Sequence, residues 1–233
     1  MITPSDSDGG RASDERPWEG PAWHAVRPEH VVPAQVSDGA REEDGYVDPD
    51  DLVVLIDDSG KRIGTAPRGA VHTRSTPRHL AFSCHILDVG GRALITRRAL
   101  TKVAWPGVWT NSCCGHPRPG ERMEDAIVRR VREELGLDLN PEAVNCVMPD
   151  FSYRATDSSG IVENELCPVY VTVLDDPEEI VELYPDPDEV EEVSWVGWKD
   201  LYRTVQTMSS LLAPWTVAQM RALGGRHPSV LTG

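Results

Sequence analysis

The chain has 233 residues, enough for one domain with a substantial hydrophobic core. Hydrophobic residues make up 39% and charged residues 26%, as in a globular protein, and no apolar run approaches the roughly 20 residues that span a bilayer. The net charge of -15 is uneven: residues 175–192 carry ten acidic and no basic residues, and residues 1–45 are also acidic. The near-neutral remainder leaves room for an anion pocket, and the lack of a basic stripe with interleaved aromatics argues against nucleic acid as a partner.

Five cysteines form no regular framework, and two of them, Cys113 and Cys114, are adjacent. The N-terminus has neither a basic segment nor an apolar stretch. Both features favour a reducing cytoplasmic setting over secretion or a membrane. We expect a monomer or a weak dimer, and we expect Cys84, Cys146 and Cys167 to be buried free thiols.

The composition divides the chain into three parts. Residues 1–45 are rich in Asp, Glu, Gly, Pro and Ser without sustained periodicity, which predicts a disordered acidic tail. Residues 46–224 read as one mixed α and β domain, and residues 225–233 as a short C-terminal tail.

The strand patterns come first along the chain. An apolar run at 52–56 and a return at 63–65 predict a hairpin, and residues 79–88 and 92–97 predict a second one around a Gly-Gly pair. A helix is expected at 121–135, because apolar residues recur there with helical spacing and Gly136 stands at the C′ position. Strands are then expected at 143–147, 166–174 and 190–198, and helices at 199–205 and 214–223.

The segment from Gly115 to Leu137 resembles the Nudix box, G-x5-E-x7-R-E-U-x-E-E-x-G-U, in which U is a bulky apolar residue. Eight positions match: Gly115, Glu121, Arg129, Val131, Glu133, Glu134, Gly136 and Leu137. This frame clusters carboxylates at one end of a helix, where they suit a hard cation such as Mg²⁺ together with phosphate oxygens. A single Glu of the set is more simply a solvated helix residue, but the full frame is not.

Arg130 departs from the box, which has Glu at that position. A cation in place of a metal-binding carboxylate weakens the case for hydrolysis. A guanidinium there is suited instead to clamping a diphosphate through two hydrogen bonds.

Two further runs are similar to type I isopentenyl diphosphate isomerases. The first is WPGVWTNSCCGHP at 105–117, and the second is YRATD at 153–157 followed by GIVENE at 160–165. The resemblance covers residues 51–220, nearly all of the expected folded part. It implies an α+β fold, a Nudix-type α/β/α sandwich with a mixed β-sheet and the loop-helix-loop of the box. It also implies interconversion of isopentenyl and dimethylallyl diphosphate in isoprenoid biosynthesis.

That reaction protonates an unactivated alkene, so it needs an acid and a base on opposite faces of the substrate and a pocket that excludes water. The resemblance assigns these roles to Cys114 on one face and to Glu165 with Tyr153 on the other. It does not fix which group delivers the proton in each direction.

The resemblance also implies two metal sites. His72, His79 and His116, with Glu163 and Glu165, would hold one Mn²⁺, Zn²⁺ or Fe²⁺, a donor set typical of transition metals. A Mg²⁺ arriving with the substrate diphosphate would bind Glu134.

The diphosphate needs cationic side chains, and the carbocation needs an aromatic ring face. By resemblance the diphosphate contacts are Arg68, Arg98, Lys102 and Arg130; Arg68 stands where relatives carry Lys. Trp215 is expected to stabilise the cation through its ring face, with Trp105 or Trp109 as alternatives. Each residue taken singly is as easily explained by a solvated or packed side chain.

Two other functions stay open at this point. One is a Nudix pyrophosphohydrolase that acts on a nucleoside diphosphate derivative. The other is an interaction module with a structural zinc site built from the cysteines and histidines, although the spacing lacks the usual C-x₂-C pairs.

Overall fold

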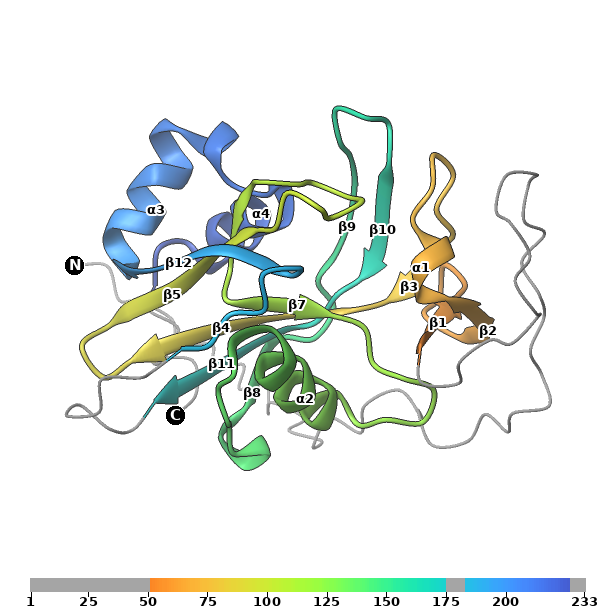
Figure 1. Ribbon diagram of the computed structural model, residues 1–233, viewed down its shortest axis with the longest axis horizontal. Coiled ribbons are helices and arrows are strands. Elements are labelled where there is room, and N and C mark those ends of the chain that lie inside the picture. Colours follow the sequence, from red (N-terminus) through yellow and green to blue (C-terminus); the bar gives the residue numbers. More distant parts are fainter. Residues whose placement is uncertain (1–50, 175–182, 227–233) are drawn as a thin grey trace, which may run out of the picture.

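The computed structural model describes residues 51–174 and 183–226 (Figure 1). The predicted acidic tail at 1–45 lies outside the described residues, as do most of the predicted C-terminal tail and part of the acidic stretch at 175–192. The described chain forms two β-sheets and four α-helices.

The first sheet has five strands in the order β2-β1-β3-β10-β9. Only β3 and β10 run parallel to each other in it. The bounds are β1 Leu52–Ile56, β2 Arg62–Pro67, β3 His79–Leu80, β9 Ser152–Thr156 and β10 Val162–Leu166. The short helix α1, Arg68–Val71, follows β2 directly.

The second sheet is larger and follows the order β12-β5-β4-β11-β8, with β6 paired to β5 and β7 to β4. Parallel pairing of β4 with β11 makes it a mixed sheet. The bounds are β4 Phe82–Asp88, β5 Arg92–Arg98, β6 Trp109–Thr110, β7 Cys113–Gly115, β8 Asn145–Met148, β11 Val169–Leu174 and β12 Val190–Gly197. A 3-10 turn, Pro141–Ala143, precedes β8, and another, Ser209–Leu211, precedes the last helix.

Helices cover both faces of the second sheet (Figure 1). Helix α2, Met123–Leu135, buries Ile127, Val131 and Leu135 against one face. Helices α3, Trp198–Thr207, and α4, Pro214–Leu223, cover the other face. The predicted α+β fold with a helix-sheet-helix sandwich is therefore confirmed.

Local sequence explains the ends of α2. Gly136 adopts a left-handed conformation with φ of 66°, and its N–H bonds to the Arg132 carbonyl, which ends the helix as predicted. The helix begins at Met123 and not at Glu121, because Glu121 belongs to the preceding loop, where its carboxylate accepts from the Arg118 N–H at 2.8 Å.

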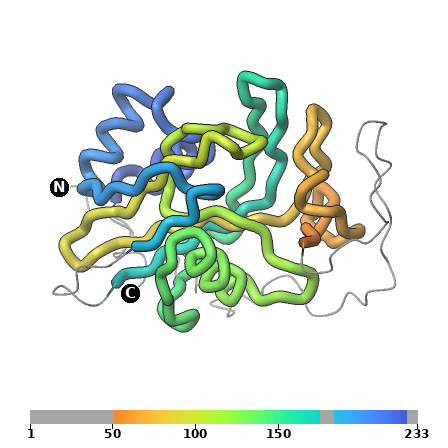
Figure 2. The backbone as a smooth tube through the Cα atoms, viewed as in Figure 1, coloured from red at the N-terminus to blue at the C-terminus, as the bar shows by residue number. Residues whose placement is uncertain are grey.

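Two predicted strands are each divided where the chain passes from one sheet to the other. The run at 79–88 forms β3 and β4, with Ala81 between them, and the run at 166–174 falls in β10 and β11, separated by Cys167 and Pro168. Pro168 has no N–H to give to a ladder. Figure 2 shows the consequence: the backbone enters the first sheet, crosses to the second and later returns to the first as the β9–β10 hairpin.

The pairing of β4 with β7 places the two adjacent cysteines and Gly115 opposite residues 82–84. Ser83 lies opposite Cys114, and Cys84 lies opposite Cys113. Phe82 lies opposite Gly115, and a Cβ at residue 115 would approach Phe82 Cζ and Arg130 Cγ to 3.0 Å. Any larger residue here would require the Phe82 or Arg130 side chain to shift by a few tenths of an ångström.

Candidate active site

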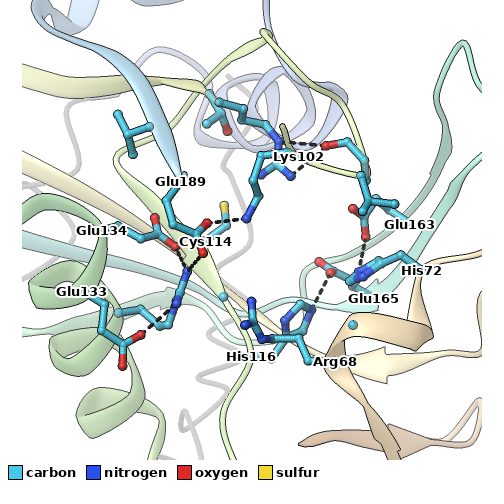
Figure 3. A pocket seen from close by; sticks show the side chains of 18 of the residues that line it. Arg68, His72, Lys102, Cys114, His116, Glu133, Glu134, Glu163, Glu165 and Glu189 are labelled. Atoms are coloured by element: carbon cyan, nitrogen blue, oxygen red, sulfur yellow. Dashed lines mark hydrogen bonds and ion pairs between the residues drawn. The ribbon is translucent and has the colours of Figure 1, made fainter. Parts of the chain in front are cut away.

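One cavity of about 640 Å³ collects nearly all of the predicted site residues (Figure 3). It is lined by residues from both sheets, from α1 and α2, and from the start of α4. The predicted residues on its wall are Arg68, His72, Arg98, Lys102, Cys114, His116, Arg130, Glu134, Tyr153, Glu163, Glu165 and Trp215. His79 alone of the predicted set is not on the wall, because it is fully buried behind it.

Three histidines and a glutamate converge at one side of the cavity. Ligand atoms of His72, His79, His116 and Glu165 all lie within 4.8 Å of one another. Glu165 Oε1 is 3.3 Å from His79 Nε2 and 3.2 Å from His116 Nε2. Glu163 joins the group through His72, whose Nε2 is 3.1 Å from its Oε2.

Strand pairing produces this convergence. Glu165 on β10 lies directly beside His79 on β3, and Glu163, two residues earlier, points to the same face of the sheet. His72 ends α1, and His116 follows β7. α1 and β3 are close in the sequence, but β7 and β10 come from distant parts of it, so spacing alone does not place all of these residues together.

The ligand set fits a metal ion. His79 Nδ1 lies 2.9 Å from the Pro77 carbonyl, which places a proton on Nδ1 and directs Nε2 into the cluster. The Nε2 atoms of His79 and His116 are only 3.2 Å apart. Imidazole nitrogens that face each other beside two carboxylates are a donor set for a divalent cation.

The charges of the cluster follow from burial and from its neighbours. Burial lowers the pKa of His116 to about 4. Burial alone would raise the pKa of Glu165, but hydrogen bonds and charges from His116 and His79 hold it well below its ordinary value. Burial, followed by the charge of Glu165, raises the pKa of Glu163.

The adjacent cysteines have different surroundings because side chains alternate along β7. Cys113 is buried in the core beneath α2, with Cys84 and Val131 in the same cluster. Cys114 faces the other way and lines the cavity. Burial raises the pKa of the Cys114 thiol to about 12, so this group carries its proton at neutral pH.

Tyr153 lies directly opposite Glu165 in the β9–β10 ladder, so both side chains share one face. Burial, together with the nearby carboxylates of Glu165 and Glu163, raises the pKa of the Tyr153 phenol well above its ordinary value. The hydroxyl is therefore a neutral donor within the cavity.

Trp215 supplies the aromatic wall. Its ring lies 5.5 Å from that of Tyr153, and its indole N–H donates to Thr110 Oγ1 at 2.8 Å. Trp105 packs edge-on against Trp215 at 6.0 Å, and Trp109 packs in the core beside α3 and α4. Among the described residues, neither alternative lines the cavity.

The four predicted diphosphate contacts differ in their present partners. Arg68 pairs with Asp51 at 2.6 Å and is half exposed. Arg98 donates to the Ala104 carbonyl at 2.8 and 3.1 Å, and its guanidinium lies 5.6 Å from the Trp215 ring centre. Lys102 pairs with Glu189, and Arg130 with Glu134.

Glu189 is a cavity residue that sequence reasoning missed. Besides Lys102, its carboxylate contacts Arg130 at 3.2 Å. Its backbone is held by Ala99, whose N–H donates to the Glu189 carbonyl at 3.0 Å, and by Asp186. In Figure 3 this network occupies one side of the cavity and the histidine cluster the other. The acidic run at 175–192 contained Glu189, but nothing in that run distinguished it from its neighbours.

The structure also places the other predicted thiols and His85. Cys84 and Cys167 are buried thiols as predicted, but the prediction for Cys146 was wrong: it is exposed on β8, next to the 3-10 turn. His85 is a fully buried core residue.

Within the described residues, the metal cluster found contains no cysteine, so the structural zinc module has no support. No helix in residues 51–174 and 183–226 is long and apolar enough to cross a bilayer.

Two solved structures share this fold. The crystal structure of DR0079 from Deinococcus radiodurans matches with a TM-score of 0.54 at 18% identity, over 73% of this chain and 98% of that one. The MutT protein from Methanosarcina mazei matches with a TM-score of 0.50 at 16% identity, over 64% and 94%. At such identities the likeness concerns the fold alone.

Sequence comparison is more specific. The NUDIX domain model matches residues 77–216. The isopentenyl-diphosphate Delta-isomerase of Cutibacterium acnes is 64% identical over 83% of this chain and 96% of its own length. The proteins of that name from Frankia alni and Clavibacter michiganensis are 53% and 51% identical, over 78% and 76% of this chain and 91% and 88% of their own. The chain therefore belongs to the NUDIX family and, within it, to the isopentenyl-diphosphate Delta-isomerases.

Proposed function

We propose that this protein interconverts isopentenyl diphosphate and dimethylallyl diphosphate. One observation carries the proposal: the Cys114 thiol, the Glu165 carboxylate, the Tyr153 phenol and the Trp215 ring line a single cavity together with a set of cations. The names of the relatives point to the same reaction.

The residues have the protonation states that the chemistry requires. Moving the double bond takes one proton to one carbon and removes another from a second carbon. Cys114 and Tyr153 hold their protons at neutral pH, whereas Glu165 is ionised. We infer that Cys114 works on one face of the alkene and Glu165 with Tyr153 on the other, and that their roles reverse with the direction of reaction.

We assign the resident metal to His72, His79, His116, Glu163 and Glu165. When bound, a Mn²⁺, Zn²⁺ or Fe²⁺ ion would fix these carboxylates and increase the acidity of groups attached to it. His79 supports the site from behind, since its ring is fully buried and oriented by the Pro77 carbonyl.

The diphosphate is assigned to the other side of the cavity. Arg98, Lys102 and Arg130 supply positive charge there, and a Mg²⁺ accompanying the substrate would add oxygen coordination with Glu134. Arg68, the fourth cation that we assign to the diphosphate, comes from α1 on the side of the histidine cluster (Figure 3). The Trp215 ring, which lies 5.5 Å from the Tyr153 ring and 5.6 Å from the Arg98 guanidinium, is suited to stabilise a tertiary carbocation.

The alternative is a pyrophosphohydrolase. Arg130 argues against it, because its guanidinium pairs with both Glu133 and Glu134, the two adjacent carboxylates of the Nudix helix.

We also propose a reducing cytoplasmic setting, with which the free cysteines agree.

The test uses the full chain loaded with Mg²⁺ and Mn²⁺. Incubation with isopentenyl diphosphate, followed by NMR of the product, is expected to give dimethylallyl diphosphate without release of phosphate. Phosphate release from a nucleoside diphosphate derivative, with no isomerisation, would establish the hydrolase instead.

A further inference from the structure

Three buried polar side chains form a row that ends at the catalytic thiol. His85 Nε2 lies 3.0 Å from Gln219 Oε1, Gln219 Nε2 lies 2.8 Å from Ser83 Oγ, and Ser83 Oγ lies 3.2 Å from Cys114 Sγ. Ser83, His85 and Gln219 are each 0% exposed. The row joins β4 and α4 to β7.

Neither the metal cluster nor the diphosphate cations account for this row. His85 and Gln219 do not line the cavity. Burying three polar groups costs free energy unless each is hydrogen-bonded, and an apolar core at these positions would avoid that cost. The His85 ring packs edge-on against the buried Trp198 ring, with the ring centres 5.5 Å apart.

The histidine sets the direction of the hydrogen bonds. His85 Nδ1 has no hydrogen-bond partner among the described residues, and burial lowers the pKa of the ring to about 4. A neutral ring protonated on Nε2 leaves only a bare lone pair unpaired, which is less costly than a buried unpaired N–H. His85 therefore donates to Gln219 Oε1, and Gln219 donates to Ser83 through Nε2.

With its oxygen accepting from Gln219, the Ser83 hydroxyl is left to donate its own proton. Cys114 Sγ is one acceptor; the buried Cys167 thiol also interacts with Ser83. On its other side, Cys114 lies 3.2 Å from Asn111 Oδ1. Asn111 is itself oriented, because its Nδ2 donates to the carbonyls of Cys84 and Cys113.

We propose that Ser83 is a positioning residue for Cys114, donating a hydrogen bond to its sulfur in a direction fixed by Gln219 and His85. This rests on the proposed function only in that Cys114 is taken as the proton-transferring thiol. Asn111 Oδ1 accepts from the S–H bond, so the two neighbours hold the sulfur between a donor and an acceptor.

The arrangement has a consequence for turnover. When the Cys114 S–H bond breaks, the proton forms a C–H bond with the alkene and the electron pair stays on sulfur as thiolate. The Ser83 O–H already points at that sulfur, so it stabilises the thiolate without reorganisation. In the reverse direction the same bond is present when the thiolate takes its proton back.

The first test compares Ser83→Thr with Ser83→Val. The two side chains have nearly the same shape, but only threonine keeps the hydroxyl, so any packing cost is shared. We expect kcat of the valine variant to be about 10- to 100-fold below that of the threonine variant, with equal KM and equal metal content. Equal kcat values, or a difference confined to KM or to metal content, would overturn the proposal.

Gln219→Met gives a second route that leaves Ser83 in place. Methionine fills a similar volume but cannot donate, so Ser83 becomes free to rotate. We expect kcat to fall several-fold, and the double variant with Ser83→Val to lose no more than Ser83→Val alone. Losses that multiply would show that Gln219 does not act through Ser83. Because Cys167 interacts with both Ser83 and Glu165, Cys167→Ala is compared in kcat and in metal content: a loss of kcat as large as that of Ser83→Val, with metal content unchanged, would assign the hydroxyl to Cys167.

The third test does not depend on turnover. Nitrogen-15 NMR of the folded metal-loaded protein reports the His85 tautomer, with the His85 signals identified by their shift in Gln219→Met. We expect a neutral ring protonated on Nε2. Protonation on Nδ1 would reverse the direction of the row and refute the proposal, whatever the isomerase assay shows.

Discussion

At the scale of single residues, the distinction between Cys113 and Cys114 comes from strand geometry. Successive side chains of β7 point to opposite faces, so Cys113 enters the core beneath α2 and Cys114 enters the cavity. The sequence motif identified Cys114 through its position beside Gly115, but it could not show where the Cys113 thiol lies.

We expect Cys114→Ala to abolish isomerisation, because no other thiol among the described residues lines the cavity. Cys113→Ala should keep most of the activity and lower the free energy of unfolding by about 1 kcal/mol, the usual cost of a small loss from a packed core. Product formation followed by NMR, beside urea unfolding of both variants, checks this. Substantial turnover by Cys114→Ala would refute the catalytic assignment.

Glu189 is an internal counter-ion for two cations that we assign to the diphosphate. Replacing Glu189 with Gln removes this competing negative charge, so inorganic pyrophosphate should bind several-fold more tightly at low salt. Calorimetric titration measures the change.

Glu192→Gln provides the matched control for that prediction. Glu192 pairs with Arg97 at 2.5 Å, and neither residue lines the cavity, so pyrophosphate binding should be unchanged. Weaker binding by Glu189→Gln would mean that Glu189 orients Lys102 and Arg130 and does not compete with the anion.

At the scale of elements, local patterns predicted most helices and strands. The apolar repeat of α2 and its terminal Gly136 were sufficient, and α4 has the expected bounds. The divisions within residues 79–88 and 166–174 were missed, because a strand that changes sheets remains apolar throughout. Strand β9 was not predicted either, because its side chains alternate only between exposed and partly buried positions and give no strong apolar pattern.

The loop before α2 depends on a different kind of interaction, a partly buried ion pair. Glu121 accepts from Arg129 Nε at 2.7 Å and Nη2 at 2.8 Å, and from the Arg118 N–H. Burial would raise the pKa of Glu121, but these bonds outweigh it and lower the pKa below its ordinary value of 4.5.

We expect Glu121→Gln to reduce the free energy of unfolding by about 1.5 kcal/mol at pH 7. Because the folded-state pKa is depressed, this contribution is complete above the unfolded pKa and is lost as pH falls through the folded one. Urea titrations from pH 7 to pH 3 should therefore show the two proteins converging at low pH. Glu124→Gln, which removes only a 3.5 Å surface pair with Arg122, should differ little at any pH. A constant difference for Glu121→Gln would contradict the ionic explanation.

At the scale of the whole molecule, the histidine cluster joins parts that the chain order separates. His79 and Glu165 come from the first sheet, and His116 follows a strand of the second. The sequence resemblance named these residues, but only the crossing of the chain between sheets explains why they meet. The main cores beside α2, α3 and α4 do not include them.

Two separable metals are therefore expected. His79→Ala should lower the metal content of the resting protein, because it removes a nitrogen ligand from a preformed cluster. Glu134→Gln should leave that content unchanged and weaken binding of the diphosphate with Mg²⁺, since a single carboxylate cannot hold Mg²⁺ without substrate oxygens. Elemental analysis and substrate titrations measure both. Loss of resting metal in Glu134→Gln, but not in His79→Ala, would mean that the sites are assigned in reverse.

The close packing at Gly115 links these two chemistries through the backbone. Cys114 precedes this glycine and His116 follows it, while Phe82 and Arg130 close over its Cα. A methyl group at residue 115 would require the Phe82 ring and the Arg130 side chain to shift by a few tenths of an ångström, and Arg130 is a residue that we assign to the diphosphate. The small size of this residue thus helps to fix the relative positions of the residues that we assign to the acid, the metal and the anion.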